Sequence, residues 1–396
     1  MDTSKGRVSP PRQRMQLSWT DPRFRGLVWQ VVVVGLVAGI IVWLWRNTVH
    51  NLDTRNISTG FGFLSREAGM PIADALISYQ PSDSYLRALI VGVLNTLRVA
   101  VIGVVLATIL GTLIGIARLS KNWLLAKLAA IYVETLRDLP LLLQLLAWYV
   151  LLQGLPPGRQ ALHPVAGVYL SNRGLILPTI AWLPEHGFVL LACAIGAAAT
   201  WMVSRVALAR QMRDGQPRRV WPVALLLIAG LPAGVSAALG VPWAINWPEL
   251  RGFNFAGGTV LSPEYVALLL ALTTYAAAFI AEIVRAGILS VSTGQWEAAG
   301  ALGLRRGLAL RLIVLPQALR VIIPPLTSQY LNLTKNSSLA VAIGYQDIVS
   351  IANTTLNQTG QAIEGIALIM AVFLAISLSI SFSMNWYNAR ITLVER

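Results

Sequence analysis

The stretch EAAGALGLRRGLALRLIVLP, residues 297–316, lies between two long apolar segments at 263–287 and 319–343. Its first part, 297–302, is rich in strong helix formers. Gly303 follows, and a glycine can take a positive φ that lets the chain turn sharply. We therefore predict two short helical pieces joined at Gly303.

The second helical piece is expected over about 304–314, and Pro316 should stop it before the next apolar segment. Ala298 and Ala299 give the first piece a smooth face that another protein surface can approach closely. The stretch therefore has the character of a docking element and not of a passive connector.

The composition is that of an integral membrane protein. Of the 396 residues, 56% are hydrophobic and 12% are charged, against about 25% charged residues in soluble globular proteins. On a soluble protein the net charge of +14 would suggest a nucleic-acid partner. Basic residues also gather in short cytoplasmic loops of membrane proteins, so we expect a lipid bilayer around the chain and no nucleic acid.

Candidate spans, each of about 20 mostly apolar residues, recur along the whole chain. The first is longer than the apolar core of a signal peptide, and we interpret it as a retained span. The predicted fold is all-α, with about eight transmembrane helices at roughly 26–46, 89–116, 138–155, 187–208, 220–241, 263–287, 319–343 and 363–385.

The lysines and arginines predict the orientation of these spans. They gather before the first span and in alternate loops, whereas the loop at 344–362 contains none. Because basic loops stay on the cytoplasmic side, we expect both termini and the 297–316 stretch in the cytoplasm. Residues 1–25 then form a cytoplasmic basic tail, and 47–88 form a periplasmic loop.

The full spacing of the 297–316 stretch resembles the EAA loop of ABC importer permeases. That pattern is Glu-Ala-Ala, three residues, glycine, nine residues and then Ile-x-Leu-Pro. It falls here without a gap on Glu297, Ala298, Ala299, Gly303, Ile313, Leu315 and Pro316.

Neighbouring segments resemble the histidine/glutamine branch of the polar amino-acid permeases. They read NTLRV at 95–99, ETLRDLPLLLQ at 134–144, YAAAFIAEIVRAGI at 275–288 and TKNSSL at 334–339. One departure is Asp138-Leu139 before Pro140, where that family commonly has Gly-Thr. The enlarged layout is similar to one permease subunit of the general L-amino acid importers of Gram-negative bacteria.

The resemblance implies a type I ABC importer permease domain at about 89–390, with extra spans at 26–46 and 187–241. Loop 297–316 would then seat in a separate ATPase subunit as a coupling helix. Glu297 would pair with a basic group of that ATPase, or would simply favour the N-terminus of its own helix.

The implied partners complete a bacterial inner-membrane importer of L-amino acids. They are an ABC ATPase in two copies, a second homologous permease subunit and a periplasmic amino-acid-binding protein. No G-x-x-x-x-G-K-[ST] loop occurs in the sequence. ATP and Mg²⁺ are therefore expected on the ATPase, and this chain is expected to be no enzyme and to bind no cofactor.

Polar and charged side chains within the spans are candidates for the substrate path, because a charge in lipid is costly and marks function. The candidates are Lys335, Asn336, Ser337, Ser338, Arg98, Asn95 and Gln144. A cation with amide and hydroxyl donors suits the α-carboxylate of an amino acid. The group at 335–338 could instead cap a broken helix. Arg98 could instead pair with Glu282 or with another acidic residue. Glu282 and Arg285 are interpreted as structural ion-pairing groups.

The main alternative is a secondary amino-acid transporter or a channel without ATPase coupling. Such proteins usually contain inverted repeats with paired broken helices, which the sequence does not show. A membrane enzyme or a metal site is less favoured, since His50, His163 and His186 have no metal-ligand spacing.

Overall fold

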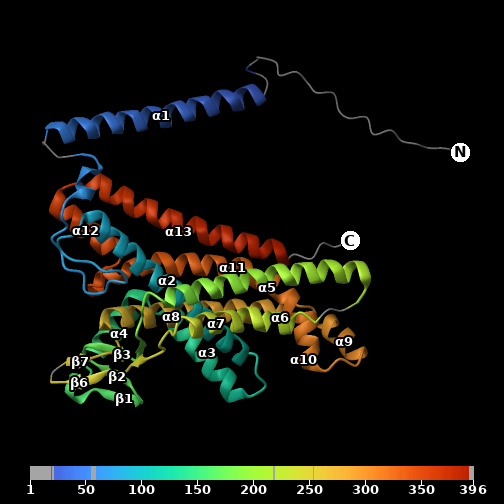
Figure 1. Cartoon of the computed structure of the whole chain (residues 1–396). Helices are drawn as coiled ribbons and strands as arrows, with labels where there is room; N and C mark the ends of the chain where they lie inside the picture. The colour runs from blue at the N-terminus through green and yellow to red at the C-terminus, as the bar shows by residue number, and fades with distance from the viewer. Residues whose placement is uncertain (1–18, 20–21, 55–58, 217–218, 253, 392–396) are drawn as a thin grey trace.

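The computed structural model describes residues 19, 22–54, 59–216, 219–252 and 254–391. Most of the tail predicted at 1–25 lies outside these residues. The helices are α1 (Pro22–Thr54), α2 (Tyr85–Ala117), α3 (Trp123–Asp138), α4 (Leu141–Gln153), α5 (His186–Asp214), α6 (Trp221–Leu225), α7 (Leu231–Ala238), α8 (Pro263–Leu289), α9 (Thr293–Ala301), α10 (Arg306–Ala309), α11 (Leu315–Asn336), α12 (Ile348–Thr359) and α13 (Ala362–Ile391). The start of α1 and the end of α13 lie at the same end of the molecule as α9 and α10, with the β-strands at the opposite end (Figure 1).

The described chain contains seven helices long and apolar enough to cross a membrane, and a bent helix pair makes an eighth candidate. The predicted fold class, a helical integral membrane protein with about eight spans, is thereby confirmed. The seventh span is extended at its end by a 3-10 helix, η5 (Ser337–Ile343). Its helical segment runs without a break over Gly307–Ile343.

The third predicted span, at 138–155, is wrong in its bounds. α4 has 13 residues, which is too short for a bilayer that needs about 20. α3 precedes it, and the two helices meet at a bend of 106°. Pro140 causes the break, because it cannot continue α3 and it begins α4 with a φ of −56°. The third candidate span is therefore the bent pair α3–α4.

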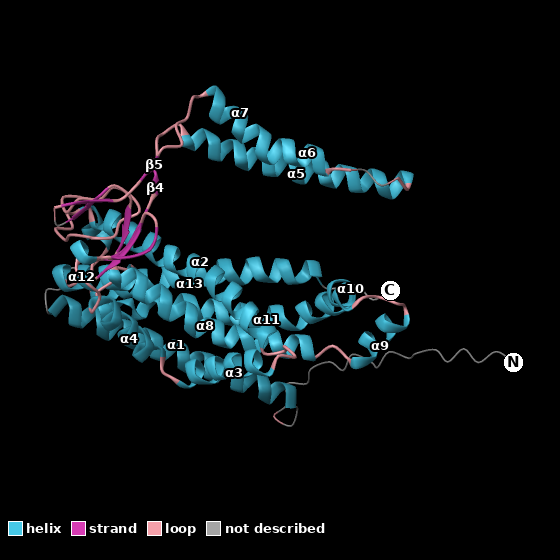
Figure 2. Cartoon of the chain, turned by 90° about the horizontal axis from the view of Figure 1, so that it is seen from below, coloured by secondary structure: helices cyan, strands magenta, loops and turns pink. Residues whose placement is uncertain are grey.

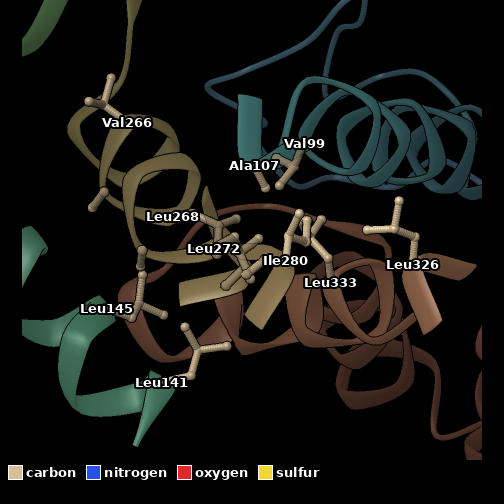
Figure 3. Close-up of a cluster of buried hydrophobic side chains, with 14 of the residues drawn as sticks. Val99, Ala107, Leu141, Leu145, Val266, Leu268, Leu272, Ile280, Leu326 and Leu333 are labelled. Atoms are coloured by element: carbon tan, nitrogen blue, oxygen red, sulfur yellow. The ribbon is translucent and has the colours of Figure 1, made fainter. Parts of the chain in front are cut away.

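The core of the bundle is built around α8, which packs against α2, α3, α4 and α11. Figure 3 shows Leu268, Leu272 and Ile280 of α8 among side chains from α2, α4 and α11. α2 and α8 approach closely because α2 carries Gly111 and Gly115 at the contact. A Cβ atom at Gly111 would lie 2.8 Å from the carbonyl oxygen of Ala277, so only glycine fits this close backbone approach.

Two parts of the chain stand outside this core. None of the apolar window of α1 is buried. α5 packs against α7 and against a π-helical turn, η3 (Leu226–Gly230), that joins α6 to α7. Figure 2 shows this pair of spans apart from the other helices. These are the extra spans of the sequence analysis, and their apolar surface faces away from the core.

Short β-strands, which the sequence analysis did not predict, form the end of the molecule opposite α9. β1 (Leu162–Val165), β2 (Val168–Ser171), β3 (Gly174–Leu177) and β8 (Thr259–Leu261) make an antiparallel sheet in that order. β4 (Thr179–Ile180) pairs with β5 (Ile245–Asn246), and β6 (Glu249–Arg251) pairs with β7 (Asn254–Ala256). β4 leads into α5, and β5 follows α7. The two connections between the extra pair of spans and the rest of the chain therefore lie side by side, and we call them the β4–β5 neck.

A further helix, α12, occupies part of the loop predicted at 344–362. Asp347 caps its N-terminus by accepting a hydrogen bond from the Ser350 backbone N–H at 2.8 Å. Ile348 and Ile351 pack beneath Phe63 of the 3-10 helix η1 (Phe61–Ser65) in a second small apolar cluster. The segment before α2 is thus anchored on the helices and is not a free loop.

Candidate functional site

The 297–316 stretch forms a sharply turned helical loop between α8 and α11. α9 ends at Ala301, and Gly303 follows with a φ of +71°. The backbone N–H groups of Gly303 and Leu304 donate to the carbonyls of Gly300 and Ala299, at 2.9 and 3.0 Å. These bonds close the end of α9 in the manner of a glycine helix stop. The predicted turn at Gly303 is confirmed.

The helix after the turn differs from the prediction. α10 passes into a π-helical turn, η4 (Leu310–Val314), and this runs directly into α11. Pro316 therefore does not stop the helix, and that expectation is wrong. The wider π turn offers a physical reason, because it relieves the clash of a proline ring with the preceding carbonyl groups. One continuous helix leads from the loop into the membrane.

The residues of the EAA pattern divide between the surface and the core. Glu297, Ala298, Gly303 and Leu315 are exposed, whereas Ala299 is 1% exposed. Ile313 and Pro316 are half-buried. Glu297 is not in the first turn of its helix, because α9 begins at Thr293. The interpretation of Glu297 as a helix N-terminal charge is therefore wrong, and its carboxylate is free to meet another protein.

A hollow of about 750 Å³ lies between the two halves of the loop. Glu297 lines it, together with Trp296, Leu304 and Leu310 among other residues. Gln317 donates to Gln295 at 3.3 Å and links α9 to the start of α11. The loop thus presents a concave, partly apolar surface with one exposed carboxylate.

Glu282 forms an ion-pair cluster at the same end of the bundle. Its carboxylate accepts hydrogen bonds from the Arg285 guanidinium, with Nε at 3.2 and 3.1 Å from the two oxygens. Arg118, at the end of α2, donates to the same carboxylate. Arg98 is not its partner, contrary to one of the two expectations for that residue. The cluster joins the end of α2 to α8, near the loop 297–316.

Arg98 belongs instead to a polar cluster at the N-terminal half of α2. Its guanidinium carbon lies 4.2 Å above the ring centre of Tyr265. Electrostatic effects on Tyr265 and Tyr345 come from both Arg98 and Asp74, so the two charges lie near the same pair of rings. Tyr345 is 2% exposed, and burial, followed by the charge of Asp74, raises the pKa of its hydroxyl.

A strap formed by residues 70–74 lies across this cluster. Asn95, fully buried, donates to the backbone oxygens of Asp74 and Gln346 at 2.7 and 2.9 Å. Gln346 in turn bonds the strap twice, to the Pro71 oxygen and to the Ala73 N–H, each at 2.8 Å. Ser262, at the start of α8, donates to the Asp74 carboxylate. The strap is therefore fixed to α2, to α8 and to the turn before α12.

The other substrate-path candidates lie elsewhere and make local bonds. Gln144 donates to the carbonyls of Leu136 and Leu139, at 2.9 and 3.0 Å, and so caps the end of α3 at the break. The hydroxyls of Ser337 and Ser338 donate to the Thr334 and Lys335 carbonyls. These are local bonds to the carbonyl three residues back, in a helix that continues from α11 into η5, while the Lys335 side chain is exposed and Asn336 is half-buried.

Several members of the polar cluster carry no signal in the amino-acid sequence. Asp74 and Gln346 come from segments treated as polar loops, and the two tyrosines stand at span edges without a motif. Asp74 follows Gly69 and Pro71 in a polar segment, and its carboxylate matches no sequence motif. Only the fold brings it beside Arg98. Among the described residues no group of three or more His, Cys, Asp or Glu side chains could hold a metal ion.

The described chain is thus a multi-span helical protein with an exposed, sharply turned helical loop between two of its spans. Residues 103–393 match the family described as the binding-protein-dependent transport system inner membrane component. The chain belongs to this family.

Three relatives align along nearly their whole length. The putative amino-acid ABC transporter permease protein YhdX of Escherichia coli K12 is 52% identical over 388 residues, 96% of this chain and 97% of that protein. The general L-amino acid transport system permease protein AapQ of Rhizobium johnstonii is 48% identical, covering 95% and 94%. The glutamate/glutamine/aspartate/asparagine transport system permease protein BztB of Rhodobacter capsulatus is 42% identical, covering 98% and 99%.

The chain is thus an inner-membrane permease subunit of an ABC importer and not an enzyme. An importer of this family works with an ATPase subunit and with a binding protein. The family favours this function over the alternative of a secondary transporter or channel.

Proposed function

We propose that this chain is one of two different permease subunits of an importer for a broad range of L-amino acids. The single observation that carries the coupling role is the exposed loop turned at Gly303, with Glu297 at its edge. The amino-acid class is supported by the segments at 95–99 and 275–288 and by the relatives, one described as a general L-amino acid permease.

The proposed assembly contains two copies of the ATPase, which bind ATP and Mg²⁺, and a second homologous permease. This chain binds no cofactor. A periplasmic binding protein delivers the substrate from the side of the β-strands. Both termini and loop 297–316 face the cytoplasm, as the distribution of basic residues supports.

The coupling follows from the shape of the loop. When the ATPase pair closes on ATP, it displaces α9 and α10, which seat on it through Glu297 and the concave surface. α10, η4 and α11 form one continuous helix, so a displacement at the loop is carried rigidly into the membrane. Packed interfaces respond to such a displacement by switching between discrete arrangements, which alternates access to the substrate path.

Arg98 is the proposed substrate contact that the geometry supports best among the candidates. An α-amino acid carries a carboxylate and an ammonium group, and Arg98 and Asp74 offer the two opposite charges near one pair of tyrosines. Asn95 holds the strap over this place. Lys335, Asn336, Ser337, Ser338 and Gln144 are proposed to shape the path through the helix ends they cap or occupy.

The experiment uses the complete complex, purified through a tag on this chain and reconstituted in liposomes. Mass spectrometry should identify a Walker-loop ATPase and a second EAA-bearing permease at fixed stoichiometry. Uptake of radiolabelled amino acids and ATP hydrolysis are then measured together. Arg98→Gln should retain the ATPase and lose uptake.

Gly303→Val should keep the complex assembled while uptake per ATP falls at least tenfold, because valine strongly disfavours a φ of +71°. Glu297→Arg should weaken retention of the ATPase by reversing the exposed charge. Gly234→Val, at a helical position in α7 with open space around it, is the matched control. Unchanged uptake per ATP in both loop variants would contradict the coupling role.

A further inference from the structure

A groove of about 620 Å³ runs between α5 and α6, in the extra pair of spans. Its walls are apolar side chains at one end and two arginines at the other. The lining residues are Met202, Val203, Val206, Ala207, Arg210, Arg219, Val220 and Val223. The groove lies outside the helical core and away from the coupling loop, and no part of the proposed transport mechanism uses it.

The apolar wall faces the surroundings of the protein and not its interior. Met202 is 63% exposed, and Val206 and Val223 are 44% and 45% exposed. Within the pair the packing is tight, because the backbone of η3 approaches Gly196 of α5. A Cβ atom at Gly196 would lie 2.1 Å from the carbonyl oxygen of Leu227. The groove is therefore a fixed surface between two closely held helices.

The two arginines stand where lipid headgroups begin. At about 1.5 Å per residue, Arg210 lies about 36 Å along α5 from His186, beyond a hydrocarbon layer of about 30 Å. Trp221 opens α6 with its side chain exposed, and exposed tryptophans favour the membrane interface. Arg219 lies two residues before the start of this helix. Both guanidiniums thus lie at headgroup level on the same side of the pair.

Neither arginine is neutralised within the described part of the chain. The salt bridges found there join other residues, and none contains Arg210 or Arg219. Arginine is suited to bidentate hydrogen bonding of phosphate oxygens. Two unneutralised guanidiniums at the mouth of an apolar groove are complementary to one molecule that carries a phosphate next to a hydrocarbon chain.

We propose that this groove binds an anionic phospholipid. Its phosphate lies between Arg210 and Arg219, and one acyl chain follows Met202, Val206 and Val223 toward the middle of the bilayer. Basic pockets between transmembrane helices on the cytoplasmic side are the kind of site at which anionic headgroups gather. The bound lipid fills the face between α5 and α6 that the protein leaves open.

A free phosphate or a nucleotide shares the headgroup chemistry but does not account for the apolar wall. The ATPase could meet the arginines, but it cannot reach the part of the groove within the bilayer. The test therefore separates the headgroup from the chain and from a protein partner.

The full-length chain, purified in mild detergent with its lipid removed, is titrated with palmitoyl-oleoyl phosphatidylglycerol. Native mass spectrometry counts the retained lipid. Palmitoyl-oleoyl phosphatidylcholine, with the same chains, and inorganic phosphate are the two comparison arms. We expect one retained phosphatidylglycerol, much weaker retention of phosphatidylcholine and no competition by millimolar phosphate.

The double variant Arg210→Gln, Arg219→Gln should weaken retention by roughly an order of magnitude. Arg213→Gln removes the same charge from the same end of α5 but does not line the groove, so it should retain the lipid as the unmodified chain does. Val206→Trp fills the apolar wall and should weaken retention while both arginines stay.

Three results would overturn the proposal. Equal retention of the two phospholipids would remove headgroup recognition, and an equal loss in Arg213→Gln would reduce the effect to general surface charge. Full competition by inorganic phosphate would make the site one for a free anion. If the glutamine variants do not fold, Val206→Trp carries the test, since it leaves both arginines in place.

Discussion

A buried carboxylate distinguishes the turn between η5 and α12. Asp347 is 1% exposed, and only one of its oxygens has a partner within the described structure, the Ser350 N–H. Burial raises the pKa of this carboxyl from 3.8 to about 7, although its backbone hydrogen bonds act in the opposite direction. Tyr345 is the neighbouring titratable group for which an electrostatic effect of Asp347 is found. The folded chain therefore holds this carboxyl mainly in its protonated form below about pH 7.

The raised pKa predicts how stability changes with pH. Between about pH 4 and pH 7 the folded chain holds this proton and the unfolded chain releases it. The free energy of unfolding therefore falls as the pH rises through this window, by on the order of 4 kcal/mol. Asp347→Asn keeps a good helix cap and removes the titration. We expect its melting temperature in detergent to be flat across the window and higher than that of the unmodified chain above pH 7.

Glu249→Gln is the control for this prediction, because it removes a surface carboxylate that is not buried. Its melting temperature should follow pH as in the unmodified chain. A pH slope that persists in Asp347→Asn would show that the titrating group is another residue.

Among the elements, α2 and α8 depend on each other through two glycines. A Cβ atom at Gly111 would lie 2.7 Å from Cβ of Ile280, and one at Gly115 would lie 2.7 Å from the Ala281 carbonyl oxygen. Gly111→Leu should therefore push the helices apart and destabilise the chain by about 1–3 kcal/mol. The measurement is the melting temperature of the purified chain in detergent. Gly234→Leu, which meets nothing within 4 Å in the described structure, should leave it unchanged, and an equal loss there would refute the packing argument.

The elements also show what the sequence can and cannot predict. The apolar spans and the turn at Gly303 follow from local composition and from the freedom of one glycine. α3 was missed as part of a span because Lys127, Glu134 and Arg137 lower its average hydropathy. The bend after α3 depends on Pro140. The free carbonyl groups at the end of α3 accept hydrogen bonds from the Gln144 side chain, which lies five to eight residues farther along the chain.

The polar cluster could not be predicted for a different reason. Asn95 and Gln346 are 251 positions apart and meet only because α2 and the turn before α12 pack together. Asp74 reaches them from a third segment. Such long-range contacts leave no periodicity in the sequence, so Arg98 and Asn95 could be proposed as polar span residues but their partners could not.

For the whole molecule, the connection of the extra spans has a consequence that can be measured. β4 and β5 pair antiparallel, and just beyond them Ala181 donates its N–H to the Ala244 oxygen at 3.1 Å. The two ends of the inserted segment therefore lie side by side. The rest of the chain continues from β3 to β8 and from α4 to α8 without it.

Residues 182–243 should accordingly be replaceable by Asn-Gly, which forms the two-residue turn that joins antiparallel strands. Because the deleted segment holds two spans, every remaining span keeps its orientation. We expect the shortened chain to enter the membrane, to retain the ATPase and to lose the retained phosphatidylglycerol. Deleting only 182–215 removes one span, reverses the orientation demanded of α8 and should abolish assembly. The shortened chain could instead aggregate although the ATPase and the other permease are present. That result would mean that α5–α7 supports the core and that the β4–β5 neck does not separate independent parts of the fold.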